Sequence, residues 1–512
     1  MIYRKLLDQY AELKHLEKAV ATPKTSEYIE LIRHLRAIKP GQFGGQTVII
    51  GGAGMAGLCS AYELSKLGFD VVLLEAQKTH IGGRARTFRL SEHVYGEFGA
   101  MRIPEKHELT RFYISEFKLE LRKFVQANPE AISYVRGKRL KVADVEQIKK
   151  SFKLSEEEAG KSTLDYWLEI IVALIASLNE LQKDELFNSE ITDATIKELD
   201  NKSLYEVLLQ GGFSKEAIEM LVSTWGFETS LQFSLLEFLR EEIEGIWSGE
   251  FDEIVGGTDL LAKAFHEELK ICTFQNAIIT NVEQSSNSVT VNYKNSDGEK
   301  DSVTGNWFIC TLPLGVLDKV SFEPALSFAK SEAIRRVNYD SSTKILAHTT
   351  KRFWELDDQI YGGGSSSDSL IGSTWYPSDN PDKDVKVSNS ESMFLSSYTW
   401  GQSARRMDQI PEADLKEYMT NELGNLHPSL LKDPSAIKMF YRWSWTNCQW
   451  SNGAYSFFMP NEHSEFYKDL IEPEGKILLA GEHASLTHSW MQGAFESALR
   501  VVSHIVDTFK AP

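Results

Sequence analysis

The chain contains 512 residues and weighs 57.9 kDa, which exceeds one ordinary hydrophobic core and predicts two or three domains. It carries 55 Lys and Arg against 73 Asp and Glu, and the net charge of -18 repels phosphate backbones and anionic membrane surfaces. Nucleic acid and lipid are therefore not expected partners, and no apolar run approaches the roughly 20 residues of a membrane span.

Cysteine usage predicts reduced thiols and no metal framework. Cys59, Cys272, Cys310 and Cys448 lie far apart and form neither a CxxC pair nor a metal-ligand spacing with histidine. We expect all four to be buried thiols, and we expect no metal site. Residues 1–8 lack the apolar stretch of a signal peptide, so a cytoplasmic location is expected.

The first 75 residues change pattern once. Residues 1 to about 44 have Leu, Tyr and Ile at three- and four-residue spacing before Pro40-Gly41, which predicts two short helices. Residues 46–75 then contain an apolar strand at 47–50, a glycine-rich turn, a helix through Leu67 and a second apolar strand at 71–74. This order predicts a βαβ unit.

The rest of the chain alternates between helical and strand-like patterns. Residues 141–248 predict helices, one of which begins at the capping box of Ser203 and Glu206 and ends at Gly211-Gly212. Strands are expected at 277–282, 289–293, 307–312 and 477–480, and the segment 362–367 (GGGSSS) is expected to be a flexible loop. The predicted fold class is α/β, or α+β overall.

The turn after the first predicted strand fits the GxGxxG pattern of a Rossmann dinucleotide-binding unit. It reads Gly52-Ala53-Gly54-Met55-Ala56-Gly57. Its glycines let the backbone approach a pyrophosphate, and the start of the helix offers free N–H groups and a partial positive charge. Glu75 ends the second strand, where a carboxylate can accept both ribose hydroxyls. The alternative is a glycine-rich turn that binds no nucleotide.

Four further segments favour a flavin enzyme over a nicotinamide enzyme. They are 81–86 (IGGRAR), 251–257 (FDEIVGG), 309–316 (ICTLPLGV) and 479–483 (LAGEH). With the glycine turn they resemble the FAD domain of the flavin amine oxidases, over residues of about 45 to 510. The resemblance implies non-covalent FAD and a Rossmann-type FAD-binding domain assembled from three segments. It also implies a β-sheet substrate domain and a helical domain, as in p-hydroxybenzoate hydroxylase.

Domain boundaries and an oligomeric state follow from the same resemblance. The FAD-binding domain would comprise 45–87, 251–335 and 465–512, and the helical domain 141–250. The substrate-binding domain would comprise 1–44, 88–140 and 336–464. The resemblance also implies a homodimer.

The resemblance assigns residues to the cofactor. Glu482 would bind the ribityl chain, Ile279 would meet the adenosine, and Met491 and Gln492 would lie by the flavin ring. The alternative for Glu482 is a carboxylate that caps a helix. The remaining expected cofactor contacts are Gly52, Ala53, Gly54, Met55, Ala56, Gly57, Glu75, Ala76, Gly82, Gly83, Arg84, Gly99, Ala100, Met101, Arg102, Gly481 and Trp490.

The segment 97–107 (EFGAMRIPEKH) resembles the L-amino acid oxidases within this family, in which the arginine binds the substrate carboxylate. A planar guanidinium forms two parallel hydrogen bonds with a carboxylate, so Arg102 suits an amino acid better than a simple amine. The alternative is a structural ion pair of Arg102 with Glu97 or Glu105.

Two polar side chains are expected beside the reacting atoms. By resemblance, Tyr376 would give the substrate carboxylate a second hydrogen bond, and Lys344 would hold a water against flavin N5. The alternatives are a packed aromatic residue before a proline turn for Tyr376 and a solvated strand lysine for Lys344.

An aromatic wall is expected from two segments near the C-terminus. Trp445 and Tyr455 would flank the reacting carbon, and Trp490 would form the other wall. Ser489 stands where many oxidases have glycine, and its carbonyl could accept a hydrogen bond from the substrate amine. The alternative is that these aromatic residues belong to the core.

The expected activity is oxidation of L-amino acids to 2-oxo acids, ammonia and hydrogen peroxide. Dioxygen is the expected oxidant because no second dinucleotide motif is evident. An amide-forming amino-acid 2-monooxygenase, a monoamine or polyamine oxidase and a non-catalytic FAD-binding protein stay open. The proposed base in venom-type enzymes is a histidine; its place is taken here by Glu241, which we expect to be a helix-surface carboxylate. Glu241 and Glu244 could select Lys or Arg if they face the pocket.

Overall fold

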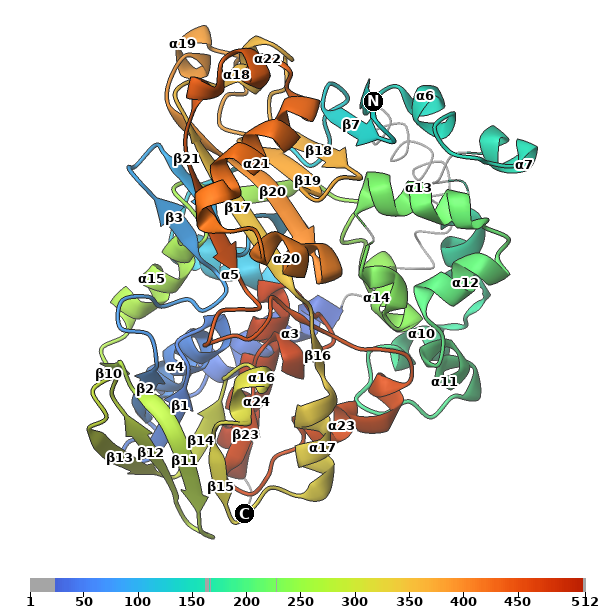
Figure 1. The fold of residues 1–512 in the computed structure, drawn as a ribbon. Coiled ribbons are helices and arrows are strands. Elements are labelled where there is room, and N and C mark those ends of the chain that lie inside the picture. The colour runs from blue at the N-terminus through green and yellow to red at the C-terminus, as the bar shows by residue number, and fades with distance from the viewer. Residues whose placement is uncertain (1–23, 162–164, 166, 227, 510–512) are drawn as a thin grey trace.

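The computed structural model describes residues 24–161, 165, 167–226 and 228–509 (Figure 1). Its centre is a five-stranded parallel sheet whose strands come from three distant parts of the chain. This confirms the predicted mixed α/β class with a parallel sheet. In spatial order the strands are β10 (Cys272–Gln275), β2 (Asp70–Glu75), β1 (Thr47–Gly51), β14 (Trp307–Cys310) and β23 (Ile477–Leu479).

Alternation along β1 gives the sheet two apolar faces. Val48 and Ile50 pack into one core cluster with α4 (Met55–Leu67) and α24 (Met491–Thr508), whereas Ile49 packs into a second cluster on the opposite face. That second face is covered by a four-stranded sheet. Its order is β13 (Lys300–Gly305), β12 (Val289–Lys294), β11 (Ile278–Gln284) and β15 (Ser321–Glu323).

The first described helix packs on the helices that cover the parallel sheet. Helix α3 (Lys24–Arg36) contacts α4, α24 and α5 (Glu108–Glu116), and its Ile32 and Leu35 belong to their core cluster. Residues 24–36 thus pack with the helices on one face of the parallel sheet, whereas residues 1–44 were expected in the substrate-binding domain. The first of the two predicted helices lies outside the described residues.

A seven-stranded sheet forms the top of the molecule in Figure 1. It contains residues 363–367 as a strand, so the expectation of a flexible loop over 362–367 was wrong. Gly363–Ser367 pairs with two neighbouring strands, because its small residues fit where larger side chains would clash. A Cβ on Gly363 would lie 2.5 Å from Asn128, and one on Gly364 would lie 3.1 Å from the Trp375 ring. The strand order is β21 (Ile437–Ser444), β17 (Ser342–Thr349), β20 (Ser392–Trp400), β19 (Ser373–Tyr376), β18 (Gly363–Ser367), β7 (Ile132–Val135) and β8 (Lys138–Lys141).

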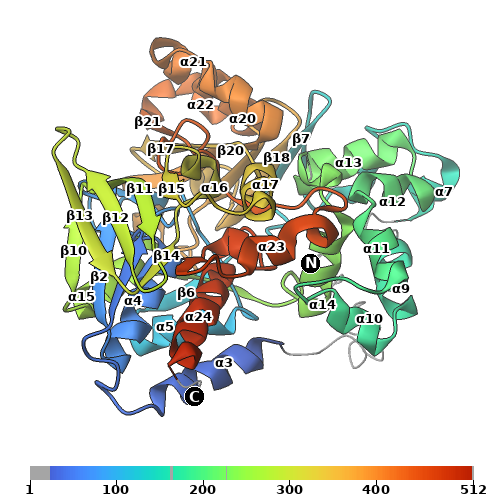
Figure 2. The ribbon, with the colours of Figure 1, turned by 90° about the horizontal axis from the view of Figure 1, so that it is seen from below.

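The predicted helical region forms a separate layer with its own apolar cluster, at the right in Figure 2. Ser203 and Glu206 form the predicted capping box, and the helix ends at Gly211. The layer comprises α6 (Val145–Lys149), α7 (Glu156–Gly160), η1 (Leu168–Val172), α9 (Ala173–Ser177), α10 (Glu180–Glu185), α11 (Ala194–Asp200), α12 (Leu204–Gln210), α13 (Lys215–Trp225), η2 (Ser230–Gln232) and α14 (Leu235–Glu244).

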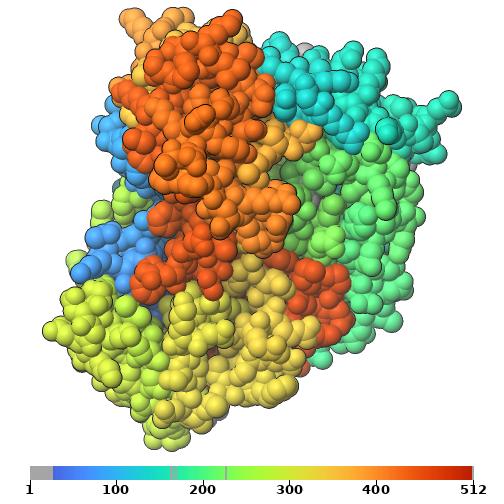
Figure 3. Space-filling view, in the orientation of Figure 1, coloured from blue at the N-terminus to red at the C-terminus, as the bar shows by residue number. Residues whose placement is uncertain are grey.

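Shorter elements connect these layers, and the C-terminal part of the chain emerges between them in Figure 3. The strands are β3 (Thr87–Arg89), β4 (Tyr95–Glu97), β5 (Ile103–Pro104), β6 (Leu121–Phe124), β9 (Phe251–Ile254), β16 (Asn338–Tyr339) and β22 (Ser456–Phe457). The helices are α15 (Asp259–Glu268), α16 (Leu314–Leu317), α17 (Phe328–Arg336), α18 (Phe353–Leu356), α19 (Val385–Ser388), α20 (Gly401–Asp408), α21 (Glu412–Leu426), α22 (Ser429–Lys432), η3 (Pro434–Ala436), η4 (His463–Tyr467), α23 (Lys468–Ile471) and η5 (Glu482–Ala484).

The cysteines are only partly as expected. Cys59 and Cys310 are buried, but Cys272 is exposed because it lies on the edge strand β10, and Cys448 is half-buried. All four are free thiols. No helix in the described part of the chain combines the length and apolarity needed to cross a bilayer.

Candidate active site

One continuous cavity of about 1870 Å³ runs from the glycine turn after β1 to the helical layer and the seven-stranded sheet. Its two ends differ in composition. The first is lined by backbone of the glycine turn and by Glu75, and the second by aromatic and charged side chains such as Arg102 and Trp375. A cavity of this size and shape suits a long cofactor with a substrate beside it.

The glycine turn has the geometry that a pyrophosphate requires. Gly52 has φ 100°, and a Cβ on Gly57 would lie 1.9 Å from the Gly52 carbonyl oxygen. Helix α4 begins directly after Gly54, so its N-terminus faces the cavity. Glu75 lies at the end of β2 and accepts the backbone N–H groups of Ala53 and Gln77, each at 2.8 Å. Burial raises the pKa of Glu75.

The predicted cofactor residues do not all reach the cavity. Ala53 and Gly57 lie behind the turn, where Gly57 allows close packing of helix and strand. Gln492 is buried, and its Oε1 accepts the N–H groups of Leu109 and Thr110 at the start of α5. Its side chain therefore binds the start of α5 and does not line the cavity where the flavin ring is expected. The predicted residues that line the cavity are Gly52, Gly54, Met55, Ala56, Glu75, Ala76, Gly82, Gly83, Arg84, Gly99, Ala100, Met101, Arg102, Ile279, Gly481, Glu482, Trp490 and Met491.

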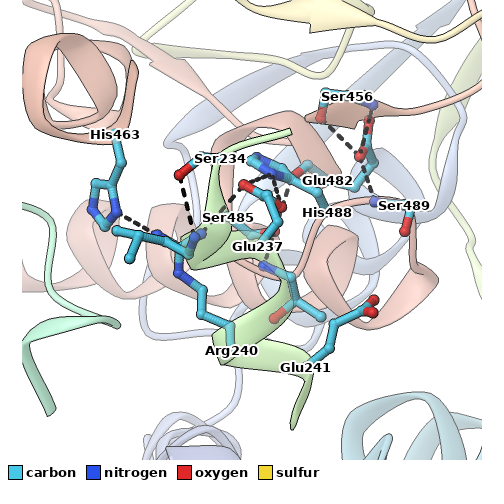
Figure 4. Close-up of polar contacts among 12 residues, drawn as sticks. Ser234, Glu237, Arg240, Glu241, Ser456, His463, Glu482, Ser485, His488 and Ser489 are labelled. Atoms are coloured by element: carbon cyan, nitrogen blue, oxygen red, sulfur yellow. Dashed lines mark hydrogen bonds and ion pairs between the residues drawn. The ribbon is translucent and has the colours of Figure 1, made fainter. Parts of the chain in front are cut away.

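Arg84 and Glu482 form a buried ion pair in the middle of the cavity. Arg84 Nη1 donates to Glu482 Oε1 at 2.7 Å and to the Ala454 carbonyl at 3.1 Å. Glu482 also accepts from Ser456 Oγ at 2.8 Å and from the Ser489 N–H at 2.9 Å (Figure 4). Burial raises the pKa of Glu482, but the Arg84 charge and neighbouring histidines outweigh it and lower the pKa to about 2. This carboxylate is ionised at neutral pH.

Arg102 lines the second end of the cavity, which we term the substrate end because the substrate is expected there. Its guanidinium carbon is 5.0 Å from the Trp247 ring centroid and 5.2 Å from that of Trp375, and its Nη1 donates to Gln126 Oε1 at 3.1 Å. Glu97 has other partners, because it accepts Thr87 Oγ1 and the Thr258 N–H. The two indole faces hold the guanidinium in the cavity wall.

Lys344 is almost fully buried on β17 and lines the same cavity. Its Nζ donates to the Gly99 carbonyl at 2.7 Å and lies 4.3 Å from the Tyr398 ring centroid. Burial lowers the pKa of Lys344, although the Glu97 charge opposes the shift. The alternative of a solvated lysine was wrong.

Tyr376 does not reach the site. Residues alternate across β19, so Trp375 faces the cavity and Tyr376 faces the core behind the sheet. The Tyr376 hydroxyl lies 2.8 Å from both Ser365 Oγ and His427 Nε2. Tyr398, on β20, lines the cavity instead. Burial raises the pKa of Tyr398, and the positive charge of Arg102 partly opposes this increase.

The expected aromatic wall is present. Trp445, Tyr455, Trp490 and Ser489 all line the cavity. Trp445 Nε1 donates to the Phe98 carbonyl at 2.7 Å, which fixes its ring. Ser489 has φ 66°, a left-handed conformation in which a serine is strained.

Two residues of the site were missed or misjudged from the sequence. Trp247 follows α14 in an irregular segment and carried no recognised motif. Glu241 was expected on the helix surface, but it lines the cavity and accepts the indole N–H groups of Trp490 at 2.9 Å and Trp247 at 2.8 Å. Burial raises the pKa of Glu241. The spacing of apolar residues on α14 predicts which side of the helix is apolar. Whether the polar side faces solvent or the cavity depends on tertiary packing, which the sequence does not reveal.

Comparisons with known proteins agree with this geometry. Residues 55–506 match the model of the flavin containing amine oxidoreductases. The chain belongs to this family. It is 34% identical to YobN of Bacillus subtilis over 90% of this chain and 94% of that protein. It is 30% identical to the L-amino-acid oxidase of Siganus canaliculatus over 94% of this chain and 89% of that protein, and 30% identical to that of Bothrops atrox over 90% and 88%.

The family membership implies FAD as the cofactor and oxidation of a CH–NH₂ group as the reaction. The fold agrees: wild-type putrescine oxidase bound to putrescine superposes with a TM-score of 0.72 at 18% identity, over 90% of this chain and 99% of that one. The cavity fits FAD on its own evidence. The glycine turn can take a pyrophosphate, Glu75 a ribose, and the Arg84–Glu482 pair the polar chain that joins pyrophosphate to flavin.

Proposed function

We propose that the protein is an L-amino-acid oxidase that binds FAD without a covalent bond. It would convert L-amino acids to 2-oxo acids, ammonia and hydrogen peroxide with dioxygen as the oxidant. The observation that carries this proposal is the position of Arg102. A guanidinium held between Trp247 and Trp375 in the cavity can donate two parallel hydrogen bonds to a carboxylate, a group that a simple amine lacks.

The remaining residues have roles that follow from their placement. FAD, when bound, supplies the acceptor for the hydride that leaves the substrate Cα. Trp445, Tyr455 and Trp490 exclude water and limit the orientations of the substrate. The Tyr398 hydroxyl can donate a second hydrogen bond to the carboxylate on Arg102, the role that the sequence assigned to Tyr376. Imino acid released into water hydrolyses to the 2-oxo acid and ammonia.

Lys344 is suited to the oxidative half of the reaction. Its Nζ is fixed by Gly99 and Tyr398 in a site from which other residues exclude water, and in its protonated form it is a cation there. A cation in such a site stabilises negative charge that develops on reducing dioxygen. Replacing Lys344 with Met should slow reoxidation by oxygen more than it slows reduction by substrate.

Anaerobic titration tests the proposal. The FAD-loaded protein is mixed with L-amino acids, D-amino acids and carboxylate-free amines, and flavin absorbance near about 450 nm is followed. Bleaching by L-amino acids alone is expected. Bleaching by simple amines alone would replace the proposal with an amine oxidase, and an amide product in air would replace it with a 2-monooxygenase.

A further inference from the structure

Helix α14 contributes four glutamates to the cavity lining, Glu237, Glu241, Glu242 and Glu244. Glu237, Glu241 and Glu244 follow one another at four- and three-residue spacing, which places them on one face of the helix. Glu237 already has side-chain partners: His488 Nδ1 lies 3.1 Å from both of its oxygens, and the Arg240 guanidinium Nη1 lies 3.2 Å from Oε1. Figure 4 shows Glu241 one turn along, with its carboxylate directed away from this network.

Glu241 is oriented by two neutral donors. Trp490 Nε1 donates to Oε1 and Trp247 Nε1 donates to Oε2. Glu241 takes no part in the ion pairs found within residues 24–161, 165, 167–226 and 228–509. A carboxylate withdrawn from water costs free energy unless a cation neutralises it. A positively charged ligand group at this point of the cavity would supply that neutralisation.

Trp247 connects Glu241 to Arg102. The indole N–H binds the carboxylate at 2.8 Å, while the ring face lies 5.0 Å from the guanidinium carbon. A negative and a positive group are therefore held against the edge and the face of one indole ring. An α-amino acid carries its carboxylate and ammonium on the same carbon, so Arg102 and Glu241, which contact one indole ring, can bind the two groups at the same time. The cationic end of a lysine side chain would extend well beyond it.

We propose that Glu241 binds the α-ammonium group of the substrate and accepts its proton, with Trp247 and Trp490 as positioning residues. This inference rests on the proposed oxidation of amino acids. With Arg102 on the carboxylate, Glu241 completes a clamp for the zwitterion. The ammonium proton moves to a Glu241 oxygen, which leaves a neutral amine with a free lone pair and a protonated carboxyl group. Because burial raises the pKa of Glu241, the carboxylate is a stronger base than one in water.

Binding of unreactive ligands tests the clamp. α-Methyl-L-leucine and 2-aminoisobutyrate are zwitterions without a Cα–H bond, and 4-methylpentanoate carries the carboxylate without the ammonium. We expect calorimetry on the FAD-loaded protein to show tighter binding of at least one zwitterion than of 4-methylpentanoate. Glu241→Gln should weaken zwitterion binding about 10- to 100-fold and change 4-methylpentanoate binding by less than about 3-fold.

Two further variants keep the test decisive. Glu242→Gln is the matched control, because Glu242 is the adjacent carboxylate and lines the same cavity, but its indole donor is Trp167 of the helical layer, at 3.2 Å, and not Trp247 or Trp490. It should leave both affinities unchanged. Trp247→Phe retains a ring for Arg102 but removes one donor to Glu241, and should weaken zwitterion binding by less than Glu241→Gln does. Equal loss of both ligand classes in Glu241→Gln would overturn the clamp.

The proton step has its own readout. The charged and titratable groups around Glu241 are Glu237, Glu244 and Arg240 on α14, Arg102 across Trp247, and His107 beside Trp490. In Glu241→Gln the anaerobic bleaching rate should rise with the fraction of free amine in solution, about 10-fold per pH unit. The wild-type rate should level off at lower pH, and identical pH profiles would overturn the role of Glu241 as base.

A panel of side chains separates this inference from its competitors. If Glu241 met a side-chain cation, Glu241→Gln would lose L-lysine and keep L-leucine; we expect similar losses for both. If the wild-type flavin were bleached by no L-amino acid, the proposed function itself would fail, whatever the variants did.

Discussion

The two ends of the cavity are built from different kinds of atoms. The nucleotide end consists mainly of backbone, and in its turn Gly52 and Gly57 are packed so closely that a Cβ at either position has no room. The substrate end consists of side chains, such as Arg102, Trp247 and Glu241, that hold one another in place. The first end should therefore fail when atoms are added, and the second when atoms are removed.

Removal of the Arg102 guanidinium should have the largest effect at the substrate end. Arg102→Met is expected to lower kcat/KM for L-amino acids about 10³-fold, or about 4 kcal/mol, since a buried carboxylate would lose its charged partner. Arg102→Lys keeps the charge but loses the planar guanidinium, so its kcat/KM should lie between the values for Arg102→Met and the wild type. Steady-state kinetics with an L-amino acid and its decarboxylated amine measure this. Equal losses on both substrates would show that Arg102 is structural.

Addition of one methyl group should damage the nucleotide end. In Gly57→Ala the Cβ would lie 1.9 Å from the Gly52 carbonyl oxygen, so the turn must move. We expect the unfolding free energy of the FAD-free protein to fall by about 1–3 kcal/mol, together with a large loss of bound flavin.

Gly54→Ala is the matched control within the same motif. Its Cβ would meet no atom within 4 Å, but Gly54 lines the cavity. FAD-free stability should stay within about 0.5 kcal/mol, while flavin binding weakens because the methyl group occupies the path of the pyrophosphate. If Gly54→Ala bound flavin normally, the pyrophosphate would not bind at this turn, and the assignment of the nucleotide end would be wrong.

The same contrast explains which predictions came from the sequence. The βαβ unit, Glu75 and the glycine turn are local in the chain, so their spacing alone located the nucleotide end. The substrate end depends on which face of an element meets the cavity. On β19 the sequence placed Tyr376 in the cavity, whereas its neighbour Trp375 lies there and Tyr376 lies in the core. On α14 the sequence placed Glu241 on the outer surface, whereas it lines the cavity. Tertiary packing decides both orientations. Trp247 had no motif at all.

Glu482 lies between the two ends of the cavity. Its negative charge should make the stability of the fold decrease in acid. Its pKa is about 2 in the folded protein against an ordinary value of 4.5, so its ionised form stabilises the fold. That contribution is complete above about pH 4.5 and is lost as the pH falls toward 2.

Glu482→Gln should therefore lower Tm at neutral pH, and the Tm difference from wild type should shrink below about pH 4.5. Ser456→Ala, which removes one hydrogen bond to Glu482 but no charge, should give a smaller difference that does not narrow in this way. A difference in Tm that is independent of pH for Glu482→Gln would contradict the charge-based account. Flavin retention measured on the same samples shows whether the pair also supports the cofactor.

A pair of tyrosines provides the smallest and most specific test. Tyr376→Phe removes a buried hydroxyl that contacts Ser365 and His427 behind the sheet, so it should cost about 1–3 kcal/mol of stability and leave kcat/KM within about 2-fold. Tyr398→Phe removes the hydroxyl beside Arg102 and should raise KM for L-amino acids about 5- to 10-fold with a smaller change in stability. Thermal unfolding and steady-state kinetics on both variants separate the two faces of the sheet. If Tyr376→Phe instead impaired KM and Tyr398→Phe did not, the carboxylate would lie on the opposite side of β19 from Arg102, and the geometry of the whole substrate end would be wrong.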